Sequence, residues 1–303
     1  MQPENLTTPF RSGYVSIVGA PNVGKSTLLN HFIGEKLSIV TFKAQTTRHK
    51  IIGIYSDDHS QIIFQDTPGY LNPEYLLHEK MLGYAKNSIE DSNLVLLMID
   101  ATKPEPFKNQ YLTDHLTSNS KTPVFLVVNK IDEVTGERVE KLAQEYRTHY
   151  PMISQTFKIS AEKGINTDAL LDTIKSIMPE HEAFFPTDDL STHSVRFFVE
   201  EIIREKIFLK FEKEIPYSTA VQVIDYQERP DSADFIDAEI IVERPSQKII
   251  VVGKGGSKIK ELGQAAREDV EKLIGKPVYL RLFVKVRDSW RKKDNFLTSF
   301  GYE

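Results

Sequence analysis

Short runs of apolar residues alternate with amphipathic segments through the first half of the chain. These runs have the length of strands, and they lie at Tyr14–Val18, Ile51–Tyr55, Gln61–Gln65, Leu94–Asp100, Val124–Asn129 and Thr156–Ile159. Amphipathic, helix-like segments lie between most of them, which is typical of a mostly parallel sheet covered by helices. The turn-rich sequence SDDHS separates the second run from the third, so this pair is expected to form an antiparallel hairpin at one edge of the sheet.

The pattern changes after a helix expected near Thr167–Met178, which should stop before Pro179. The following residues show no clear periodicity, and we expect a linker over residues 181–194 between a first domain at 1–180 and a second at 195–303. The second domain is expected to contain a helix, two strands, two helices around a glycine-rich loop, and a strand. Their predicted ranges are Val195–Phe211, Ser218–Tyr226, Ile236–Val242, Ile249–Val252, Lys258–Ile274 and Val278–Val286.

The composition fits this two-domain organisation. A chain of 303 residues exceeds the usual size of one domain, and 40% hydrophobic with 27% charged residues is typical of a soluble globular protein. There is no cysteine, which excludes disulfides, thiolate metal sites and a cysteine nucleophile. Because this composition suits a reducing compartment, we expect a cytoplasmic protein.

The apolar runs argue against insertion into a membrane. The first 14 residues carry acid and proline where a signal peptide needs a basic stretch followed by an apolar one, so we expect a short unprocessed tail. No run approaches the ~20 apolar residues needed to cross a bilayer. Any membrane contact is therefore expected to be peripheral.

The net charge of −5 is unevenly distributed along the chain. Residues 244–293 contain 14 lysines and arginines against 5 acidic residues, a local net charge of +9. Such a segment is typical either of a surface that binds a polyanion or of a lysine-rich face turned to solvent.

The clearest chemical signal is a phosphate-binding loop between the first strand and a helical segment. It comprises Gly19, Ala20, Pro21, Asn22, Val23, Gly24, Lys25 and Ser26, followed by Thr27. Its glycines let the backbone wrap an anion, so that N–H groups and a helix N-terminus point at the β-phosphate. Lys25 adds a positive charge across the β- and γ-phosphate oxygens, and Ser26 offers its hydroxyl to Mg²⁺. A strand before the loop and a helix after it favour a ligand site over an empty turn.

Three more motifs each follow a predicted strand. They are Asp66-Thr67-Pro68-Gly69, Asn129-Lys130-Ile131-Asp132 and Ser160-Ala161. Asp66 is expected to hold a metal-bound water, and the N–H group of Gly69 to reach the γ-phosphate. Any one of these motifs alone is more often an ordinary turn. Together, and in this order at the carboxyl ends of strands, they indicate one nucleotide site.

The base of the nucleotide is expected to be guanine. The Asp132 carboxylate can accept two hydrogen bonds from the N1–H and 2-amino groups of guanine, a donor pair that adenine lacks. Asn129 and Lys130 would tie their loop to the phosphate loop and cover the base plane. The Ser160-Ala161 pair would present a backbone N–H to the guanine carbonyl oxygen.

A polar, poorly periodic segment from Lys43 to His49 precedes the hairpin. A mobile loop there can bring a threonine hydroxyl to Mg²⁺ when GTP is bound, and we favour Thr47 over Thr46. The alternative is a surface turn with two strand-capping threonines. The predicted metal ligands are therefore Ser26, Thr47 and, through water, Asp66.

No catalytic residue is evident. Where some GTPases carry a glutamine that orients water just after the DxxG motif, this chain has Tyr70, which cannot do that with its side chain. Thr47 and Gly69 are expected to support the transition state. Intrinsic hydrolysis should be slow unless a partner, an ion or a rearranged loop positions the water.

The second domain carries a GxxG loop that comprises Gly253, Lys254, Gly255 and Gly256, followed two residues later by Lys258. Between two helices, such a loop can clamp the sugar-phosphate backbone of a short single strand while the bases lie on an apolar groove. Alone, it is more often a glycine-rich turn between helices. The order of elements, the local charge and the basic run from Trp290 to Lys293 favour RNA. Trp290 either stacks on a base or packs the end of the domain.

In these motifs the sequence closely resembles the Era family of bacterial GTPases over nearly its whole length. The marks in the first half are GAPNVGKSTLLN, KAQTTRHKIIGI, DTPG, NKID and SAEKG, and those in the second half are EIIREKI, IPYS, VVGKGGSKIKELGQAAR, VKVRDSWR and the closing GY. The resemblance implies a Ras-like P-loop domain joined to a smaller α+β KH domain of the second topological type.

The resemblance also implies a function and a set of partners. The family's role would make this chain a switch that binds Mg²⁺ and GTP, binds the 3′ end of small-subunit ribosomal RNA, and assists assembly of the small ribosomal subunit. Peripheral contact with the cytoplasmic face of the inner membrane is a further implication, and a monomer is expected. One departure is Tyr70, because relatives usually have a smaller apolar residue at that position.

Two other functions stay open. The first is a constitutive RNA-binding protein whose nucleotide domain is only a scaffold, which RNA affinity independent of GTP would support. The second is a membrane-associated signalling GTPase whose basic segment meets anionic lipid. Against the second, the basic residues surround a GxxG loop and do not form one continuous amphipathic helix.

Overall fold

The computed structural model describes residues 9–103, 109–118 and 121–302. Of the tail expected over the first 14 residues, residues 1–8 lie outside this part of the chain, whereas residues 11–14 already belong to the first strand. The described residues form two compact units. The first contains the residues up to Ser38 together with Thr47–Asn72 and Leu82–Thr192, and the second contains Ile39–Thr46, Pro73–Met81 and the residues from His193 onward.

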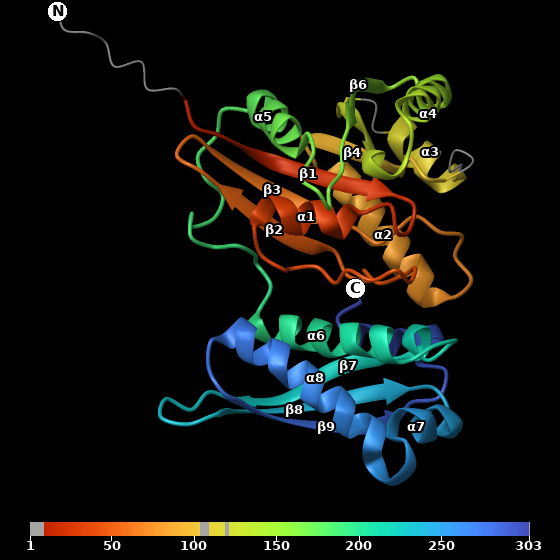
Figure 1. Cartoon of the computed structure of the whole chain (residues 1–303), viewed down its shortest axis with the longest axis vertical. Coiled ribbons are helices and arrows are strands. Elements are labelled where there is room, and N and C mark those ends of the chain that lie inside the picture. The colour runs from red at the N-terminus through yellow and green to blue at the C-terminus, as the bar shows by residue number, and fades with distance from the viewer. Residues whose placement is uncertain (1–8, 104–108, 119–120, 303) are drawn as a thin grey trace, which may run out of the picture. The chain divides into compact units, whose positions relative to one another are not determined.

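A six-stranded sheet forms the centre of the first unit (Figure 1). Its strands are β1 (Arg11–Gly19), β2 (Ile51–Ser56), β3 (Ser60–Asp66), β4 (Leu94–Asp100), β5 (Val124–Asn129) and β6 (Ile153–Lys158), in the spatial order β2-β3-β1-β4-β5-β6. All neighbours are parallel except β2 and β3. The predicted hairpin at the sheet edge is thus confirmed, and β6 begins three residues before the predicted start at Thr156.

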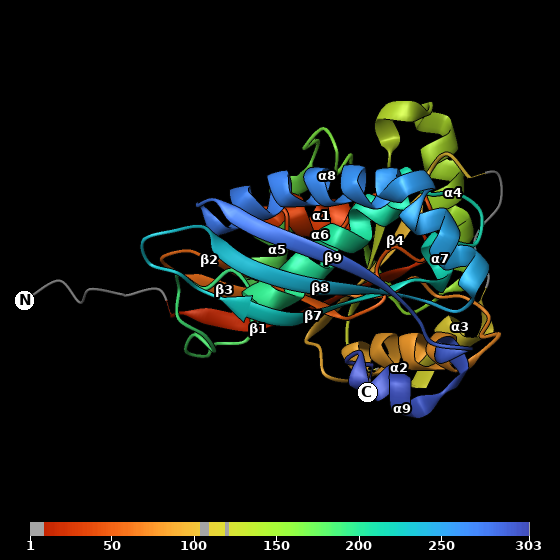
Figure 2. The same cartoon turned by 90° about the horizontal axis from the view of Figure 1, so that it is seen from below.

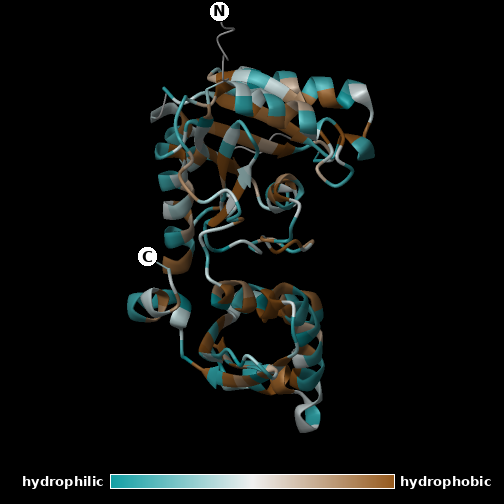
Figure 3. Cartoon of the chain, turned by 90° about the vertical axis from the view of Figure 1, so that its left-hand side faces the viewer, coloured by the Kyte–Doolittle hydropathy of each residue, from teal (hydrophilic) through white to brown (hydrophobic). Residues whose placement is uncertain are grey.

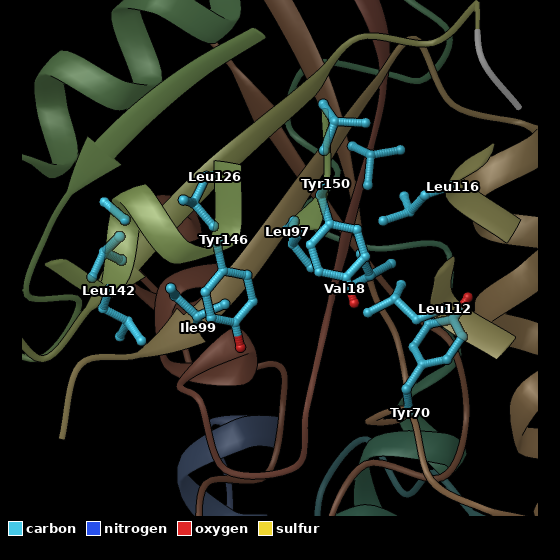
Figure 4. Packing of buried hydrophobic residues seen from close by; sticks show 14 of the residues in the cluster. Val18, Tyr70, Leu97, Ile99, Leu112, Leu116, Leu126, Leu142, Tyr146 and Tyr150 are labelled. Atoms are coloured by element: carbon cyan, nitrogen blue, oxygen red, sulfur yellow. The ribbon is translucent and has the colours of Figure 1, made fainter. Parts of the chain in front are cut away.

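Helices cover both faces of this sheet. They are α1 (Lys25–Ile33), α2 (Leu76–Glu90), α3 (Gln110–Ser118), α4 (Gly136–His149) and α5 (Thr167–Ile177). Apolar side chains of α2, α3 and α4 pack with one face of β1, β4 and β5 in a single buried cluster, part of which Figure 4 shows. Helices α1 and α5 lie on the opposite face (Figure 1). The three-layer Ras-like fold that the sequence predicted is confirmed.

The buried strands explain why the motifs lie together. β4 and β5 are buried along their whole length, as strands covered on both faces must be. Because β1, β3, β4, β5 and β6 are parallel, their carboxyl ends share one edge of the sheet. The loops after these strands carry the predicted nucleotide motifs.

The segment expected to be a linker is hydrogen-bonded to the first unit. The buried side chain of Gln61 in β3 accepts hydrogen bonds from the N–H groups of Phe184 (2.7 Å) and Phe185 (3.0 Å) and donates to the Phe185 carbonyl (2.8 Å). Further along, the N–H of Ile54 in β2 donates to the Leu190 carbonyl at 2.9 Å. The segment therefore follows the β2–β3 edge of the sheet up to residue 191.

A three-stranded sheet covered by helices on one face forms most of the second unit. Its elements are α6 (Val195–Lys210), β7 (Ala220–Gln227), β8 (Asp234–Val242), α7 (Pro245–Val252), α8 (Ser257–Ile274), β9 (Val278–Val286) and α9 (Asp294–Ser299). The strand order is β7-β8-β9, with β7 antiparallel and β9 parallel to β8. This order and pairing confirm the predicted α+β domain of the second KH topology.

The core of the second unit lies between the helices and the sheet. Figure 3 shows apolar residues concentrated on the surfaces of the helices and strands that face each other. Val199, Ile203 and Ile207 of α6 are fully buried there, and so are Leu262 and Ala266 of α8. Among the described helices of both units, none is long and apolar enough to span a bilayer.

Candidate functional site

The phosphate loop runs from the end of β1 to the start of α1, and its glycines are required by close backbone approach. Gly19 has a φ of 150°, and a Cβ atom there would lie 2.2 Å from the Met98 carbonyl oxygen. Gly24 has a φ of 103°, and a Cβ atom there would lie 2.2 Å from Nδ2 of Asn129. Any larger residue at either position would displace the loop or the strand beside it.

Lys25 is the buried cation of this loop. Its Nζ donates to the Ala20 carbonyl at 2.9 Å and lies 3.4 Å from the Gly19 carbonyl. Burial lowers the pKa of Lys25 to about 8, and the nearby Asp66 carboxylate opposes that shift. The ammonium is therefore held across the loop, where phosphate oxygens can replace the two carbonyls as its partners.

Four oxygen-bearing side chains meet beside the phosphate loop. The Ser26 hydroxyl donates to Oδ2 of Asp66 at 2.6 Å and lies 3.0 Å from the Thr47 hydroxyl, and Ser38 donates to the same Oδ2 at 2.9 Å. Thr46 points elsewhere, to the Thr41 hydroxyl and the Lys43 carbonyl. Of the two threonines weighed from the sequence, the structure thus brings Thr47 to Ser26.

Asp66 provides a test of whether this cluster fits Mg²⁺. Its Oδ1 is buried and has no hydrogen-bond partner among the described residues. Burial raises the pKa of Asp66, whereas Lys25 and the hydroxyls around it favour the charged form. Hydroxyl and carboxylate oxygens are the ligands that Mg²⁺ prefers, often with water between the metal and the protein. The residues present therefore fit the ion, with the free Oδ1 available to a metal-bound water.

The segment after Asp66 is held against the phosphate loop. A Cβ atom on Gly69 would lie 2.7 Å from the Pro21 nitrogen, and the N–H of Tyr70 donates to the Gly19 carbonyl at 3.0 Å. Thr67 donates its hydroxyl to the Ile17 carbonyl at 2.9 Å, which places Pro68 in the same fixed turn.

The Tyr70 side chain lies in the core of the first unit and not at the phosphate loop (Figure 4). It is fully buried, and its hydroxyl lies 3.0 Å from Nδ1 of His115 in α3. Position 70 therefore anchors the loop, and its side chain cannot orient a water molecule for hydrolysis.

The two loops predicted for guanine are tied to each other and to the phosphate loop. Asn129 donates through Nδ2 to the Val23 carbonyl at 2.8 Å and accepts the Ala161 N–H on Oδ1 at 2.9 Å. Asp132 lies exposed in a short 3-10 turn at Ile131–Glu133, where its carboxylate is accessible to a base. The Ser160 hydroxyl accepts the N–H of Lys163 at 3.2 Å and stabilises the second loop.

Asp100 is a member of this site that sequence reasoning missed. Lys130 has a φ of 63°, and its Nζ lies 2.7 Å from Oδ2 of Asp100. Burial opposes ionisation of Asp100, but hydrogen bonds from Lys130 and Thr102 outweigh it and lower the pKa. An acidic residue at the carboxyl end of a buried strand was the available signal.

The GxxG loop of the second unit forms a short 3-10 turn, Lys254–Gly256, between α7 and α8. Gly253, Gly255 and Gly256 all have positive φ angles, of 74°, 58° and 80°. A Cβ atom on Gly255 or Gly256 would meet nothing within 4 Å, so glycine is favoured at these two positions by the positive φ angles and not by lack of space. The backbone of the loop stays accessible. The Nζ of Lys258 lies 5.8 Å from the centroid of the Phe211 ring.

A groove of about 440 Å³ opens between α8 and β9, next to the GxxG loop in the chain. It is lined by Ile259, Lys260, Gly263, Gln264, Arg267, Leu280, Arg281 and Leu282. Sequence reasoning proposed an apolar groove beside the GxxG loop but assigned no residues to its lining. The spacing of Lys260, Gly263, Gln264 and Arg267 along one helix face was the signal for its α8 side.

Trp290 cannot stack on a base in this structure. It is fully buried, and its indole N–H donates to the Ser218 carbonyl at 2.9 Å. Its ring packs edge-on against Phe300, with the ring centroids 5.5 Å apart. Of the two roles considered from the sequence, packing the end of the domain is the one the structure shows.

Comparison with known proteins assigns a family to each of the two units. Residues 14–130 match a family described as 50S ribosome-binding GTPase, and residues 214–291 match the KH domain family. An Era variant from Aquifex aeolicus, solved with GDP and AlF4⁻, is 39% identical, with a TM-score of 0.91 over 97% of this chain and 99% of that one. An Era solved with MgGDPNP and nucleotides 1506–1542 of 16S ribosomal RNA is 39% identical, with a TM-score of 0.92 over the same shares.

The fold, the phosphate loop and the guanine loops define a P-loop GTPase that is joined to a KH domain. Because identity of 39% extends over nearly the full length of both solved relatives, the chain belongs to the Era family of GTPases. The resemblance found in the sequence motifs is thus confirmed.

Proposed function

We propose that this GTPase is a nucleotide-gated switch that binds the 3′ end of small-subunit ribosomal RNA and assists assembly of the small ribosomal subunit. The observation that carries the proposal is the cluster of Ser26, Thr47 and Asp66. Thr47 and Asp66 belong to the two loops expected to respond to the γ-phosphate, and both lie within hydrogen-bond distance of Ser26. In support, an Era relative was solved with MgGDPNP and nucleotides 1506–1542 of 16S ribosomal RNA.

Mg²⁺ would be held by Ser26, Thr47 and, through water, Asp66, and it would neutralise charge on the β- and γ-phosphates of GTP. Lys25 and the backbone N–H groups of the phosphate loop bind the same oxygens. Tyr70 places no side-chain group beside them, so positioning of the attacking water falls to backbone groups, Thr47 or a partner. We therefore propose slow intrinsic hydrolysis, which ribosomal RNA or another partner could accelerate.

The RNA site would be the GxxG loop with the groove between α8 and β9. Lys254, Lys258, Lys260 and Arg267 supply positive charge to phosphates, while Ile259 and its apolar neighbours in the groove contact bases. The combination of cationic rim and apolar floor is what a short single strand requires. GTP would order the loops around Thr47 and Gly69 and thereby change RNA affinity.

We also propose a cytoplasmic monomer that makes peripheral contact with the cytoplasmic face of the inner membrane. The absence of cysteine from the sequence supports the compartment. The basic segment at residues 244–293 supports contact with an anionic surface. Sedimentation with and without anionic vesicles would measure both the oligomeric state and the contact.

Fluorescence anisotropy tests the gated switch directly. A short RNA with the 3′-end sequence of small-subunit ribosomal RNA is titrated with protein at fixed salt, with a non-hydrolysable GTP analogue, with GDP, or without nucleotide. Tighter binding with the GTP analogue supports gating, and Thr47→Ala should abolish the difference. Equal binding in all three conditions contradicts gating and supports a constitutive RNA-binding protein.

A matched pair of lysine variants locates the RNA site. Lys254→Ala should weaken binding and reduce the slope of log Kd against log salt by about one unit, because one phosphate contact is lost. Lys210→Ala removes an exposed lysine of α6 in the same unit and should leave binding unchanged. Equal effects of the two variants would contradict the assignment of the GxxG loop.

A further inference from the structure

Along β9, the three-stranded sheet of the second unit has an outer face that α6, α7 and α8 leave exposed. Side chains alternate across β9, so Leu280, Leu282 and Val284 lie on the same side of the sheet as the helices, while Tyr279 and Phe283 lie on the other. Tyr279 is 57% exposed and Phe283 is 41% exposed. Figure 2 looks onto the strands β7, β8 and β9. Large aromatic side chains are unusual on a face turned to water, and they commonly mark a binding surface.

The aromatic residues of this face form one ordered cluster with arginine. The rings of Phe235 and Tyr279 are stacked, with centroids 5.7 Å apart and planes 11° apart. The Arg281 guanidinium lies 4.9 Å from the Phe235 centroid and 5.3 Å from the Phe283 centroid. Arg229 lies 5.2 Å from the same Phe235 ring. Aromatic faces and guanidinium planes are the groups on which unpaired bases stack.

Ion pairs fix this cluster in place. Nε of Arg281 donates to Oδ1 of Asp237 on β8 at 2.7 Å, and a second bond joins the same two groups. Lys285 of β9 pairs with Glu239 of β8 in the same way. Each acidic residue is thus matched by a basic one, so stacking, and not net charge, would dominate binding to this face.

The cluster is continuous with the RNA groove. β9 is an edge strand, and its Leu280 and Leu282 line the groove between α8 and β9. Arg281 also lines that groove, although it belongs to the cluster on the outer face. Nucleotides that leave the groove over the β9 edge therefore meet Arg281 first and then Tyr279 or Phe283.

We propose that this outer sheet face is a second RNA surface, on which bases next to those in the groove stack on Tyr279 and Phe283. The inference rests on the proposed RNA binding of the second unit. It adds a binding site to the GxxG groove. A GxxG loop clamps about four nucleotides, so only an RNA longer than that would reach the outer face.

Two RNA lengths test the proposal. Anisotropy is measured with a core of about four nucleotides, which fills the groove, and with the same core extended at both ends to about twelve. Tyr279→Ala and Phe283→Ala should each weaken binding of the long RNA about tenfold and leave binding of the short RNA unchanged. Because neither substitution removes a charge, the salt dependence of the long-RNA affinity should keep its slope.

Leu209→Ala is the matched control. Leu209 is 49% exposed on α6 of the same unit, so its removal takes away similar apolar surface outside the cluster, and RNA affinity should not change. Unchanged binding of the long RNA by both aromatic variants would overturn the proposal and leave the face to a protein partner. Equal weakening of short and long RNA would also overturn it, because the loss would then lie in the groove. Failure of the unmodified protein to bind either RNA would instead refute the proposed function on which this inference rests.

Discussion

Removal of the Tyr70 hydroxyl tests directly how the loop after the DTPG motif is held. The Tyr70 side chain is fully buried, and its Oη lies 3.0 Å from Nδ1 of the partly exposed His115. Burial raises the pKa of Tyr70 and also lowers the pKa of His115, so a protonated hydroxyl donates to a neutral imidazole. The substitution Tyr70→Phe removes this hydrogen bond and keeps the ring among Val18, Leu112 and Leu116.

The expected cost is that of one hydrogen bond. A bond of this kind contributes ~0.5–1.5 kcal/mol net, so Tyr70→Phe should lower the free energy of unfolding by about 1 kcal/mol. For a unit of this size the melting temperature should fall by about 2–4 °C. Tyr70→Ala, which leaves a cavity, should cost ~3–5 kcal/mol by comparison. GDP affinity should not change with Tyr70→Phe, because the backbone bond from Tyr70 to Gly19 is retained.

Scanning calorimetry of the full chain with Mg²⁺ and GDP measures this effect. Tyr55→Phe is the control, because it removes a hydroxyl that bonds to Asp57 at 3.2 Å near the far end of β2. In the double variant with His115→Leu, the cost should be smaller than the sum of the single costs by about 1 kcal/mol. Additive costs would refute a Tyr70–His115 bond, whatever the size of each single effect.

Three more predictions concern the base, the linker and the second unit. Asp132→Asn should weaken GTP binding at least about a hundredfold. It should favour xanthosine triphosphate, because the 2-carbonyl of xanthine can accept a hydrogen bond from the amide of the new asparagine. Competition binding with both nucleotides checks this. Gln61→Leu should speed amide hydrogen exchange at Phe184–Phe185 about tenfold, because it removes three hydrogen bonds to that backbone. Mass spectrometry measures the exchange, and an unchanged rate would contradict the prediction. Burial raises the pKa of Glu200 from 4.5 to about 7, so its protonated form stabilises the fold below pH 4.5 and that contribution is lost as pH rises through 7. Glu200→Gln should therefore be more stabilising at pH 8 than at pH 4.5, by up to about 3 kcal/mol. Denaturant unfolding of the variant and of the unmodified protein at the two pH values measures this difference.

The nucleotide motifs could be predicted from the sequence because each is a short contiguous run at the end of a strand. Phosphate loops need glycines at fixed spacing, and the close approach of Gly19 to Met98 shows why. Parallel strands bring their carboxyl ends to one edge, so the order of motifs along the chain also predicted their proximity. The choice of Thr47 over Thr46 rested on the same loop and agrees with the placement of its hydroxyl beside Ser26.

The contacts that sequence reasoning missed join distant parts of the chain. Tyr70 and His115 are 45 positions apart, and nothing in either local pattern indicates that their side chains meet. Asp100 and Lys130 are 30 positions apart and belong to neighbouring strand ends. The groove joins one face of α8 to the edge of β9, so its lining residues follow from packing and not from a motif. Periodicity predicts which face of an element is buried, but it does not specify the element that packs against it.

The linker is the clearest case in which absence of periodicity did not mean absence of structure. Its backbone is held by Gln61 of β3 and by the N–H group of Ile54 in β2, a type of contact that leaves no hydrophobic repeat in the sequence. The same β2–β3 hairpin follows Thr47 and ends at Asp66, so one hairpin joins the two predicted switch loops and also binds the linker. Three residues after Ser191, which bonds to Ile52 of β2, the chain reaches the N-cap of α6 at Ser194. A shift of the hairpin on nucleotide exchange would therefore displace the segment bound to it, and α6 begins only a few residues further along the chain.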